Sequence, residues 1–240
     1  MASRCAYSSS NIKTLEESPL YLEQVFEFPW VPGRSRDAKF ARVGSLHSAI
    51  DEKYPGARIL EASTKSLDPL GVALSAFNLR LPEELGGQIL ESTYQGSKVY
   101  RDVGGRLFAQ EQLRSLPPER AKAENFQDAN LRLSHFELNG LVWAAHHGSL
   151  FYDFLFWACL LEKPKVMEQI RRFDFFTDIE FNKTSLGFQP GKSFNSQSKS
   201  AAIAKTLDRV CPKQWNVENA LEWFFHRSQQ FPAPSDNFLF

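Results

Sequence analysis

One stretch of this sequence decides how the rest is interpreted: Glu91-Ser-Thr-Tyr94-Gln95-Gly-Ser-Lys98. Positions 91, 94, 95 and 98 follow the i, i+3, i+4, i+7 spacing of one helix face, which predicts a helix from about residue 92 to about residue 100. That face is polar and carries both an acid and an amine. On a helix, Glu91 and Lys98 lie roughly 10 Å apart along the axis, so we expect them to bracket one ligand instead of pairing directly. A solvated amphipathic helix with scattered charges is the alternative interpretation.

Helix signals dominate after this stretch, and short strand signals dominate before it. The longest helices are predicted at residues 149–162, 164–173, 196–207 and 216–229. The last three begin with a proline in the first turn, a serine cap and an asparagine cap, respectively. A further helix is predicted from Ser45 to about residue 53. Strands are predicted at residues 24–28, 57–62, 77–81 and 88–90, the last two as a hairpin.

These elements predict an α+β fold, in which one helix-rich domain with a few short strands covers residues 21–229. The first 20 residues are polar and Ser-rich, and we expect them to form a flexible N-terminal arm. Residues 230–240 are punctuated by prolines and are expected to form a loose C-terminal tail. The chain has 240 residues, 42% hydrophobic and 23% charged, which is enough for one sizeable core.

The charge balance and the cysteines exclude several classes of protein. Lys+Arg and Asp+Glu both number 28, so the chain lacks the overall positive charge of a non-specific DNA binder, although a neutral chain can still carry a local basic patch. The three cysteines are far apart, which indicates neither a disulfide framework nor a zinc knuckle. No secretory signal is visible, and the most apolar stretch, residues 150–161, is too short to span a bilayer. We therefore expect a soluble, cytoplasmic protein with no membrane partner.

Common catalytic motifs are absent from the sequence. It contains no G-x-S-x-G, no P-loop and no G-x-G-x-x-G, which argues against the usual hydrolases, nucleoside triphosphatases and dinucleotide oxidoreductases. His146 and His147 are adjacent and lack the i, i+3 or i, i+4 spacing that directs two imidazoles at one ion on a helix. No metal and no cofactor are expected.

An ordered set of motifs over roughly residues 55–210 resembles the NADAR family. The pattern E-x-x-Y-Q-x-x-K over residues 91–98 is similar to the signature of that family. The other matching segments keep the family's order: Gly71-Val-Ala-Leu-Ser75-Ala-Phe77-Asn78, Ala121-Lys122, Trp143, Phe175-Phe-Thr-Asp178-Ile-Glu-Phe and Asn195-Ser-Gln-Ser-Lys-Ser.

The amino-acid sequences of several segments most resemble the NADAR branch encoded beside DarT-type toxins, which ADP-ribosylate DNA. These segments include Glu61-Ala-Ser-Thr-Lys-Ser and Phe151-Tyr-Asp. The resemblance implies an antitoxin that hydrolyses ADP-ribose from the amino group of guanine in DNA. It also implies single-stranded ADP-ribosylated DNA as substrate, ADP-ribose as product and a cognate DarT-type toxin. Two alternatives stay open: an N-glycosidase acting on a small ribosyl-phosphate metabolite, and a non-catalytic protein that neutralises a toxin by binding it.

Cleavage of such an N-glycoside builds positive charge on the sugar, and a nearby carboxylate stabilises that charge or activates water. The resemblance implies that Glu91 is this carboxylate. Lys98 either binds phosphate or sugar hydroxyls as a cation, or attacks the sugar as an imine-forming nucleophile. Asp178 is expected to hold ribose hydroxyls or to act as a second acid–base group.

The same resemblance implies a set of substrate-binding residues: Ser75, Phe77, Asn78, Tyr94, Gln95, Trp143, Asn195 and Ser196. Among them, Trp143 is a candidate for stacking on a base, and the turn into the helix at Ser196 offers backbone N–H groups for a pyrophosphate. Trp143 lies in the apolar run Leu141-Val-Trp-Ala-Ala, so a core tryptophan is the alternative.

Overall fold

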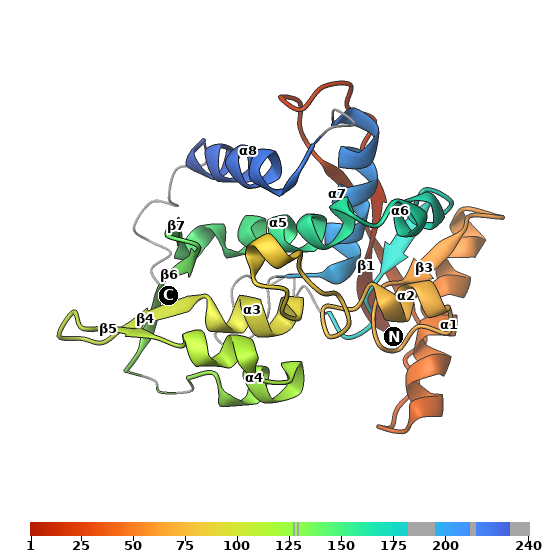
Figure 1. Ribbon diagram of the computed structural model, residues 1–240. Coiled ribbons are helices and arrows are strands. Elements are labelled where there is room, and N and C mark those ends of the chain that lie inside the picture. The colour runs from red at the N-terminus through yellow and green to blue at the C-terminus, as the bar shows by residue number, and fades with distance from the viewer. Residues whose placement is uncertain (127, 129, 182–194, 212–214, 231–240) are drawn as a thin grey trace. The chain divides into compact units, whose positions relative to one another are not determined.

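The computed structural model describes residues 1–126, 128, 130–181, 195–211 and 215–230. These residues form eight α-helices and two four-stranded sheets, which confirms the predicted α+β fold (Figure 1). The chain divides into two compact units. Unit 1 comprises Met1–Asn78 and Lys163–Gln214, and unit 2 comprises Leu79–Glu162 and Trp215–Phe240. Each unit is described by itself.

The sheet of unit 1 has the strand order β2-β1-β8-β3. Its strands are β1 (Ala2–Ser9), β2 (Tyr21–Phe28), β3 (Ile59–Glu61) and β8 (Phe175–Thr177). β1 runs antiparallel to both of its neighbours, whereas β3 and β8 are parallel. Parallel pairing brings the carboxyl ends of β3 and β8 to the same edge of the sheet.

β1 lies within the segment that we expected to be a flexible arm. Its centre, Cys5-Ala6-Tyr7, is buried between two partner strands, and Ala6 and Tyr7 are 0% and 2% exposed. The strand was not predicted because its three buried residues lie among serines and give too weak a hydrophobic pattern. The expected C-terminal tail, from residue 231 on, lies outside the described residues.

Four helices belong to unit 1: α1 (Arg36–Lys53), α2 (Pro69–Ala73), α6 (Pro164–Ile170) and α7 (Gln197–Val210). α1 begins nine residues before the predicted start at Ser45, because the Ser35 side chain accepts a hydrogen bond from the amide of Ala38 and caps the helix there. Leu46 and Ile50 of α1 pack on the sheet beside Phe26. α7 lies alongside β1 (Figure 1).

The sheet of unit 2 is antiparallel throughout, with the strand order β5-β4-β6-β7. Its strands are β4 (Lys98–Arg101), β5 (Leu107–Ala109), β6 (Arg132–Leu138) and β7 (Leu141–Ala144). The predicted hairpin at residues 77–81 and 88–90 is reduced to one isolated bridge between Arg80 and Ile89. A 3-10 turn, Glu83–Leu85, occupies the connection between these two residues.

The helices of unit 2 are α3 (Leu90–Gly96), α4 (Pro118–Glu124), α5 (Gly148–Leu161) and α8 (Val217–Gln229). Two further 3-10 turns are Glu111–Ser115 and Ala145–His147. α5 is buried along nearly its whole length and packs against α8. In the described residues, no helix combines the length and the apolar character that a bilayer crossing requires.

Candidate active site

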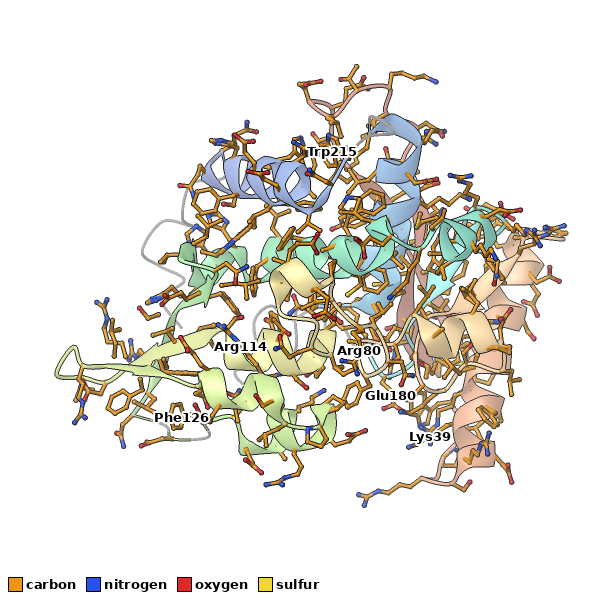
Figure 2. All side chains as sticks on the ribbon, in the orientation of Figure 1. Lys39, Arg80, Arg114, Phe126, Glu180 and Trp215 are labelled. Atoms are coloured by element: carbon orange, nitrogen blue, oxygen red, sulfur yellow. The ribbon has the colours of Figure 1, made fainter. Side chains whose placement is uncertain are left out.

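α3 is shorter than predicted, and its end changes where the lysine of the motif lies. The helix ends at Gly96, and Lys98 is the first residue of β4, so the predicted helix to about residue 100 is wrong. A Cβ on Gly96 would lie 2.5 Å from Cγ and 2.9 Å from the backbone nitrogen of Arg114, which is labelled in Figure 2. The glycine therefore allows a 3-10 turn of the protein itself, Glu111–Ser115, to lie directly against α3.

The motif nevertheless joins its acid to its amine through an amide. The Gln95 side chain donates from Nε2 to Oε1 of Glu91 at 2.8 Å, and its Oε1 accepts from Nζ of Lys98 at 2.7 Å. Only one orientation of the Gln95 amide satisfies both contacts, because a carboxylate only accepts and an ammonium only donates. Glu91 and Gln95 are 7% and 5% exposed. The carboxylate of Glu91 and the amine of Lys98 are therefore held in fixed positions by a largely buried amide.

Lys98 has the electrostatic surroundings of a reactive amine. Burial lowers the pKa of Lys98 to about 8; the nearby Lys122 adds to this shift and the Glu91 carboxylate opposes it. At pH 7 about a tenth of such an amine is neutral, compared with about one part in three thousand for a solvated lysine. Nζ also lies 5.0 Å from the centre of the Tyr94 ring.

Aromatic side chains support this group from the interior of unit 2. The Tyr94 ring packs against Phe136 at 5.2 Å, against Phe151 at 6.2 Å and against Tyr152 at 5.3 Å between centroids. Gly148 permits this packing, since a Cβ there would lie 2.7 Å from the Phe136 ring. Tyr94 therefore fixes α3 against α5 and shapes the apolar side of the lysine environment.

Trp143 lies inside the aromatic core of unit 2. It is 0% exposed and contacts the rings of Phe151, Phe154 and Phe225 at 5.4 to 6.0 Å between centroids. Trp143 is therefore packed as a core residue, which is the alternative that the apolar run Leu141–Ala145 indicated. Stacking of a base on this ring would require the core to open.

In unit 1, Asp178 follows β8 at the edge where β3 ends in Glu61. Glu61 accepts hydrogen bonds from Ser63 Oγ at 2.6 Å, from Thr177 Oγ1 at 2.7 Å and from the backbone nitrogen of Ile179 at 2.9 Å. Burial raises the pKa of both Asp178 and Glu61. The Glu61 carboxylate raises the pKa of Asp178 further, to about 7, and the Glu180 carboxylate adds to the shift of Glu61. The raised pKa values favour retention of a proton by the pair Glu61 and Asp178.

His47 extends this acidic pair towards a small pocket. Its Nε2 lies 2.9 Å from Thr177 Oγ1, and burial lowers the pKa of His47 to about 4. A pocket of about 170 Å³ is lined by His47, Glu61, Ser66 and Asp68, among other residues. Glu61 and His47 are not among the site residues predicted from the sequence. A buried acid at the end of the predicted strand 57–62 was the available signal for Glu61.

Two of the predicted substrate-binding segments meet in unit 1. The backbone nitrogen of Ala76 donates to Gln197 Oε1 at 2.9 Å, which joins the segment containing Ser75, Phe77 and Asn78 to the start of α7, where Asn195 and Ser196 lie. Ser196 is 1% exposed, and its hydroxyl lies 2.6 Å from that of Ser198.

The segment of Ser75 is also held against β3. A Cβ on Gly71 would lie 2.0 Å from the backbone oxygen of Glu61, so only glycine allows α2 to approach the strand this closely. The Asn78 side chain donates from Nδ2 to the Val72 backbone oxygen at 2.8 Å and closes the turn after α2.

The predicted site residues thus form two groups, one in each unit. Unit 2 holds Glu91, Tyr94, Gln95, Lys98 and Trp143; unit 1 holds Ser75, Phe77, Asn78, Asp178, Asn195 and Ser196. The rings of His146 and His147 lie 3.8 Å apart in unit 2. Within the described ranges, no three His, Cys, Asp or Glu side chains gather as a metal site requires.

A buried acid and a lysine with a lowered pKa, joined by an amide on an α+β scaffold, form a group suited to acid–base and amine chemistry. The family model of the DarT1-associated NADAR antitoxins matches residues 3–230, and the chain therefore belongs to this family. The resemblance inferred from the order of the motifs is confirmed. Membership brings with it an antitoxin role and an association with a DarT1 toxin. No curated protein matches the chain.

Proposed function

We propose that this antitoxin is an enzyme that hydrolyses the N-glycosidic bond between ADP-ribose and a guanine base in DNA. The hydrogen-bonded group Glu91–Gln95–Lys98 is the observation that carries the proposal, since it provides a carboxylate and an amine with a lowered pKa in one place. Membership of a family associated with a DarT1 toxin supports the choice of substrate, because the resemblance attributes ADP-ribosylation of DNA to such toxins.

Lys98 is the nucleophile of the proposed reaction. In the ring-opened form of the adduct, the guanine nitrogen is doubly bonded to C1 of the ribose and its proton has moved to the ring oxygen. The neutral Lys98 amine adds to C1, and a proton passes from Nζ to the guanine nitrogen. As the C1–guanine bond breaks, the second proton of Nζ passes to the guanine nitrogen, which leaves as the amino group of the unmodified base, and an imine between Lys98 and C1 remains.

Water completes the reaction at the imine carbon. Glu91 passes one proton of the attacking water to Nζ as the hydroxyl adds to C1, and then passes the proton of that hydroxyl to Nζ as the C1–Nζ bond breaks. The lysine is released as an amine, and ADP-ribose is released as an aldehyde that closes to its ring form. Gln95 positions both groups through its two hydrogen bonds. Asp178 is proposed as an acid–base group of this reaction.

The direct test uses a single-stranded oligonucleotide with one guanine-ADP-ribose adduct, incubated with EDTA and a substoichiometric amount of protein. We expect the mass of the oligonucleotide to return to that of the unmodified strand, with ADP-ribose released. Glu91→Gln and Lys98→Ala should abolish this turnover while leaving the thermal unfolding curve cooperative. Lys165→Ala, at an exposed lysine of unit 1, is the matched control and should react like the wild type.

Other outcomes would redirect the proposal. Turnover of a small ribosyl phosphate without turnover of the DNA adduct would favour the metabolite N-glycosidase. Neutralisation of toxin at a one-to-one ratio, with the adduct left intact, would favour a binding protein. Folded Glu91→Gln and Lys98→Ala variants that cleave as fast as the wild type would exclude this group as the active site.

The role of Lys98 is tested by trapping. Borohydride added during turnover reduces an imine, so a nucleophilic Lys98 gains the mass of ADP-ribose on the peptide that contains it. An amine that only contacts the substrate electrostatically gives no such product, and an active enzyme without trapped Lys98 would exclude the nucleophilic role.

A further inference from the structure

A concentrated basic segment stands out in this chain of zero net charge. Residues 29–42 read Pro-Trp-Val-Pro-Gly-Arg-Ser-Arg-Asp-Ala-Lys-Phe-Ala-Arg and contain four cations and one acid. Arg4 of β1 reaches the same place, because its Cζ lies 5.0 Å from the centre of the Trp30 ring. We define the basic strip of unit 1 by six residues: Arg4, Trp30, Arg34, Arg36, Lys39 and Arg42.

Trp30 is an exposed ring held in a fixed position. It is 38% exposed, and the Cζ of Arg42 lies 4.3 Å from its centre. Arg42 is itself buried and donates to the backbone oxygens of Val31 (2.7 Å) and Gly33. The loop that carries Trp30 is therefore anchored, and its exposed aromatic surface needs little ordering when a ligand binds.

The cations at the start of α1 are unfavourable for the helix itself. Arg36 is the first residue of α1, and Lys39, labelled in Figure 2, is the fourth. The N-terminus of a helix is its positive end, so cations there reduce helix stability. Ser35 already caps this end, so capping does not explain Arg36 or Lys39. Arg34 and Arg36 are exposed, which leaves their guanidinium groups accessible to an anion.

The strip begins beside the acidic pair of unit 1. Arg4 donates from Nε to the backbone oxygen of Ile179 at 2.8 Å, the residue after Asp178. The carboxylates of Asp178 and Glu180 both attract the Arg4 guanidinium. One end of the strip thus lies beside Asp178, the residue to which we assign an acid–base role.

We propose that the basic strip of unit 1 binds the single-stranded DNA that carries the modified guanine, with phosphates on Arg34 and Arg36 and one base on Trp30. This inference rests on the proposed function for the choice of DNA as the ligand. Arginine forks match phosphate oxygens, and a base stacks on an aromatic ring without regard to its identity. A membrane surface is less suitable, since the strip is one tryptophan among arginines and lacks the broad apolar face that inserts into lipid.

Binding of an unmodified single-stranded 12-mer, followed by fluorescence anisotropy over a range of salt concentrations, tests the strip without catalysis. Arg34→Ser/Arg36→Ser should weaken binding about tenfold at low salt and reduce the slope of log K against log salt by about 1.4, because two phosphate contacts are lost. Trp30→Ala should weaken binding about tenfold with the slope unchanged, because stacking releases no counterions.

Arg101→Ser/Arg132→Ser is the matched control, because these two exposed arginines of unit 2 lie directly opposite each other on β4 and β6. We expect it to bind like the wild type. If it shows the loss instead, or if Arg34→Ser/Arg36→Ser shows none, the strip is not the DNA surface. The thermal midpoint of Arg34→Ser/Arg36→Ser should stay close to that of the wild type, since removing cations from the positive end of the helix offsets the loss of the Arg36 contact with the Phe40 ring.

Two further measurements separate this inference from the proposed function. In Arg34→Ser/Arg36→Ser, kcat/KM for an adduct in the 12-mer divided by kcat/KM for the ADP-ribosylated nucleoside should fall about tenfold, following the phosphate contacts. If the protein cleaves neither substrate, the proposed function fails while the binding measurement still decides the inference. Vesicles with 30% phosphatidylserine should not bind; vesicle binding that the double substitution abolishes would overturn the assignment to DNA.

Discussion

Glu91 in unit 2 and Glu61 in unit 1 are both buried acids with fixed partners, yet they obtain those partners differently. Glu91 bonds to Gln95, four residues along the same helix. Glu61 bonds to Thr177 and Ile179, which are 116 and 118 residues away and arrive through the parallel pairing of β3 with β8. The partner of Glu91 can be predicted from the helical spacing of the motif. The partners of Glu61 depend on the register of two strands, which the sequence does not show.

The two acids also differ in the charge of their neighbours. Glu91 is linked through Gln95 to a lysine, and its negative charge favours the ammonium form of Lys98. Glu61 faces Asp178, and two close carboxylates favour retention of a proton. We therefore assign covalent chemistry to unit 2 and proton storage to unit 1, and the following changes test this division.

The largest effect is expected at the amine. Lys98→Ala should lower kcat/KM for the DNA adduct by more than about 10³-fold, because the nucleophile is removed. Asp178→Asn should lower it by about 10²-fold, the scale of one acid–base group. Single-turnover cleavage measures both. Equal losses in two folded variants would contradict the division of roles.

Close packing beside each acid gives the next largest effect. Gly71→Ala should destabilise the protein by about 3 kcal/mol, and Gly96→Ala by about 2 kcal/mol, because each Cβ would overlap a neighbour. The Gly71 Cβ meets the rigid backbone oxygen of Glu61, whereas the Gly96 Cβ first meets the side chain of Arg114. Urea denaturation measures both. A milder effect at Gly71 than at Gly96 would reverse the comparison.

Gln95 decides how tightly the unit 2 group is joined. Gln95→Leu removes both hydrogen bonds and should lower kcat about tenfold, the cost of roughly one buried hydrogen bond to a charged group. In the wild type, activity should rise with pH and level off above about 8, because the lysine must lose its proton. Gln95→Glu should move this rise to higher pH by about one unit, since an added carboxylate favours the ammonium. An unchanged pH profile would contradict the nucleophilic lysine.

The acidic pair of unit 1 predicts a smaller effect, seen in stability against pH. The raised pKa values mean that the folded state binds more protons than the unfolded chain between about pH 4 and neutrality, so this pair reduces stability as pH rises through that range. His47, whose pKa is lowered to about 4, contributes with the opposite sign up to about pH 6.5.

Glu61→Gln therefore isolates the contribution of the pair. It should reduce the change in the free energy of unfolding over this pH range by about 1 kcal/mol, as measured by urea denaturation at several pH values. Asp178→Asn should have a similar effect. The double variant should exceed either single variant but fall short of their sum, since one substitution ends the repulsion while the remaining acid stays buried. Additive effects would show that the two carboxylates titrate independently.

The smallest effect concerns a glycine with no close neighbour. A Cβ on Gly44, within α1, would have no atom within 4 Å. Gly44→Ala should stabilise unit 1 by about 0.5 to 1 kcal/mol through the helix preference of alanine, as measured by the thermal midpoint. A loss of stability would show that space alone does not distinguish Gly44 from Gly71.

Where local chemistry decides an element, the sequence was sufficient to predict it. The predicted helix starts at Pro164, after Ser196 and after Asn216 are confirmed. The proline ring suits the first turn of α6, and the Asn216 side chain caps α8 by accepting from the backbone nitrogen of Asn219, whereas the Ser196 side chain makes no capping hydrogen bond. The face formed by Glu91, Tyr94 and Gln95 follows from helical spacing in the same way.

Where distant segments decide the structure, the sequence was not sufficient. Lys98 leaves the helix because β4 pairs with β6 and because Gly96 packs against Arg114, and neither contact is visible in the spacing of the motif. β1 is a strand because residues 21–28 and 175–177 pair with it. Glu61 could be placed beside Asp178 only from the register of β3 on β8.

The position of β1 has a consequence for the synthesis of the protein on the ribosome. Tyr7 pairs with Phe176, so one neighbour of the first strand is made only after most of the chain has been translated. At ordinary elongation rates this delay is on the order of ten seconds or more. Until then β1 and β2 form a two-stranded hairpin with an open edge, which is marginally stable and able to pair with other chains. Chains released early, before β8, would therefore lack a complete unit 1 and be prone to aggregation.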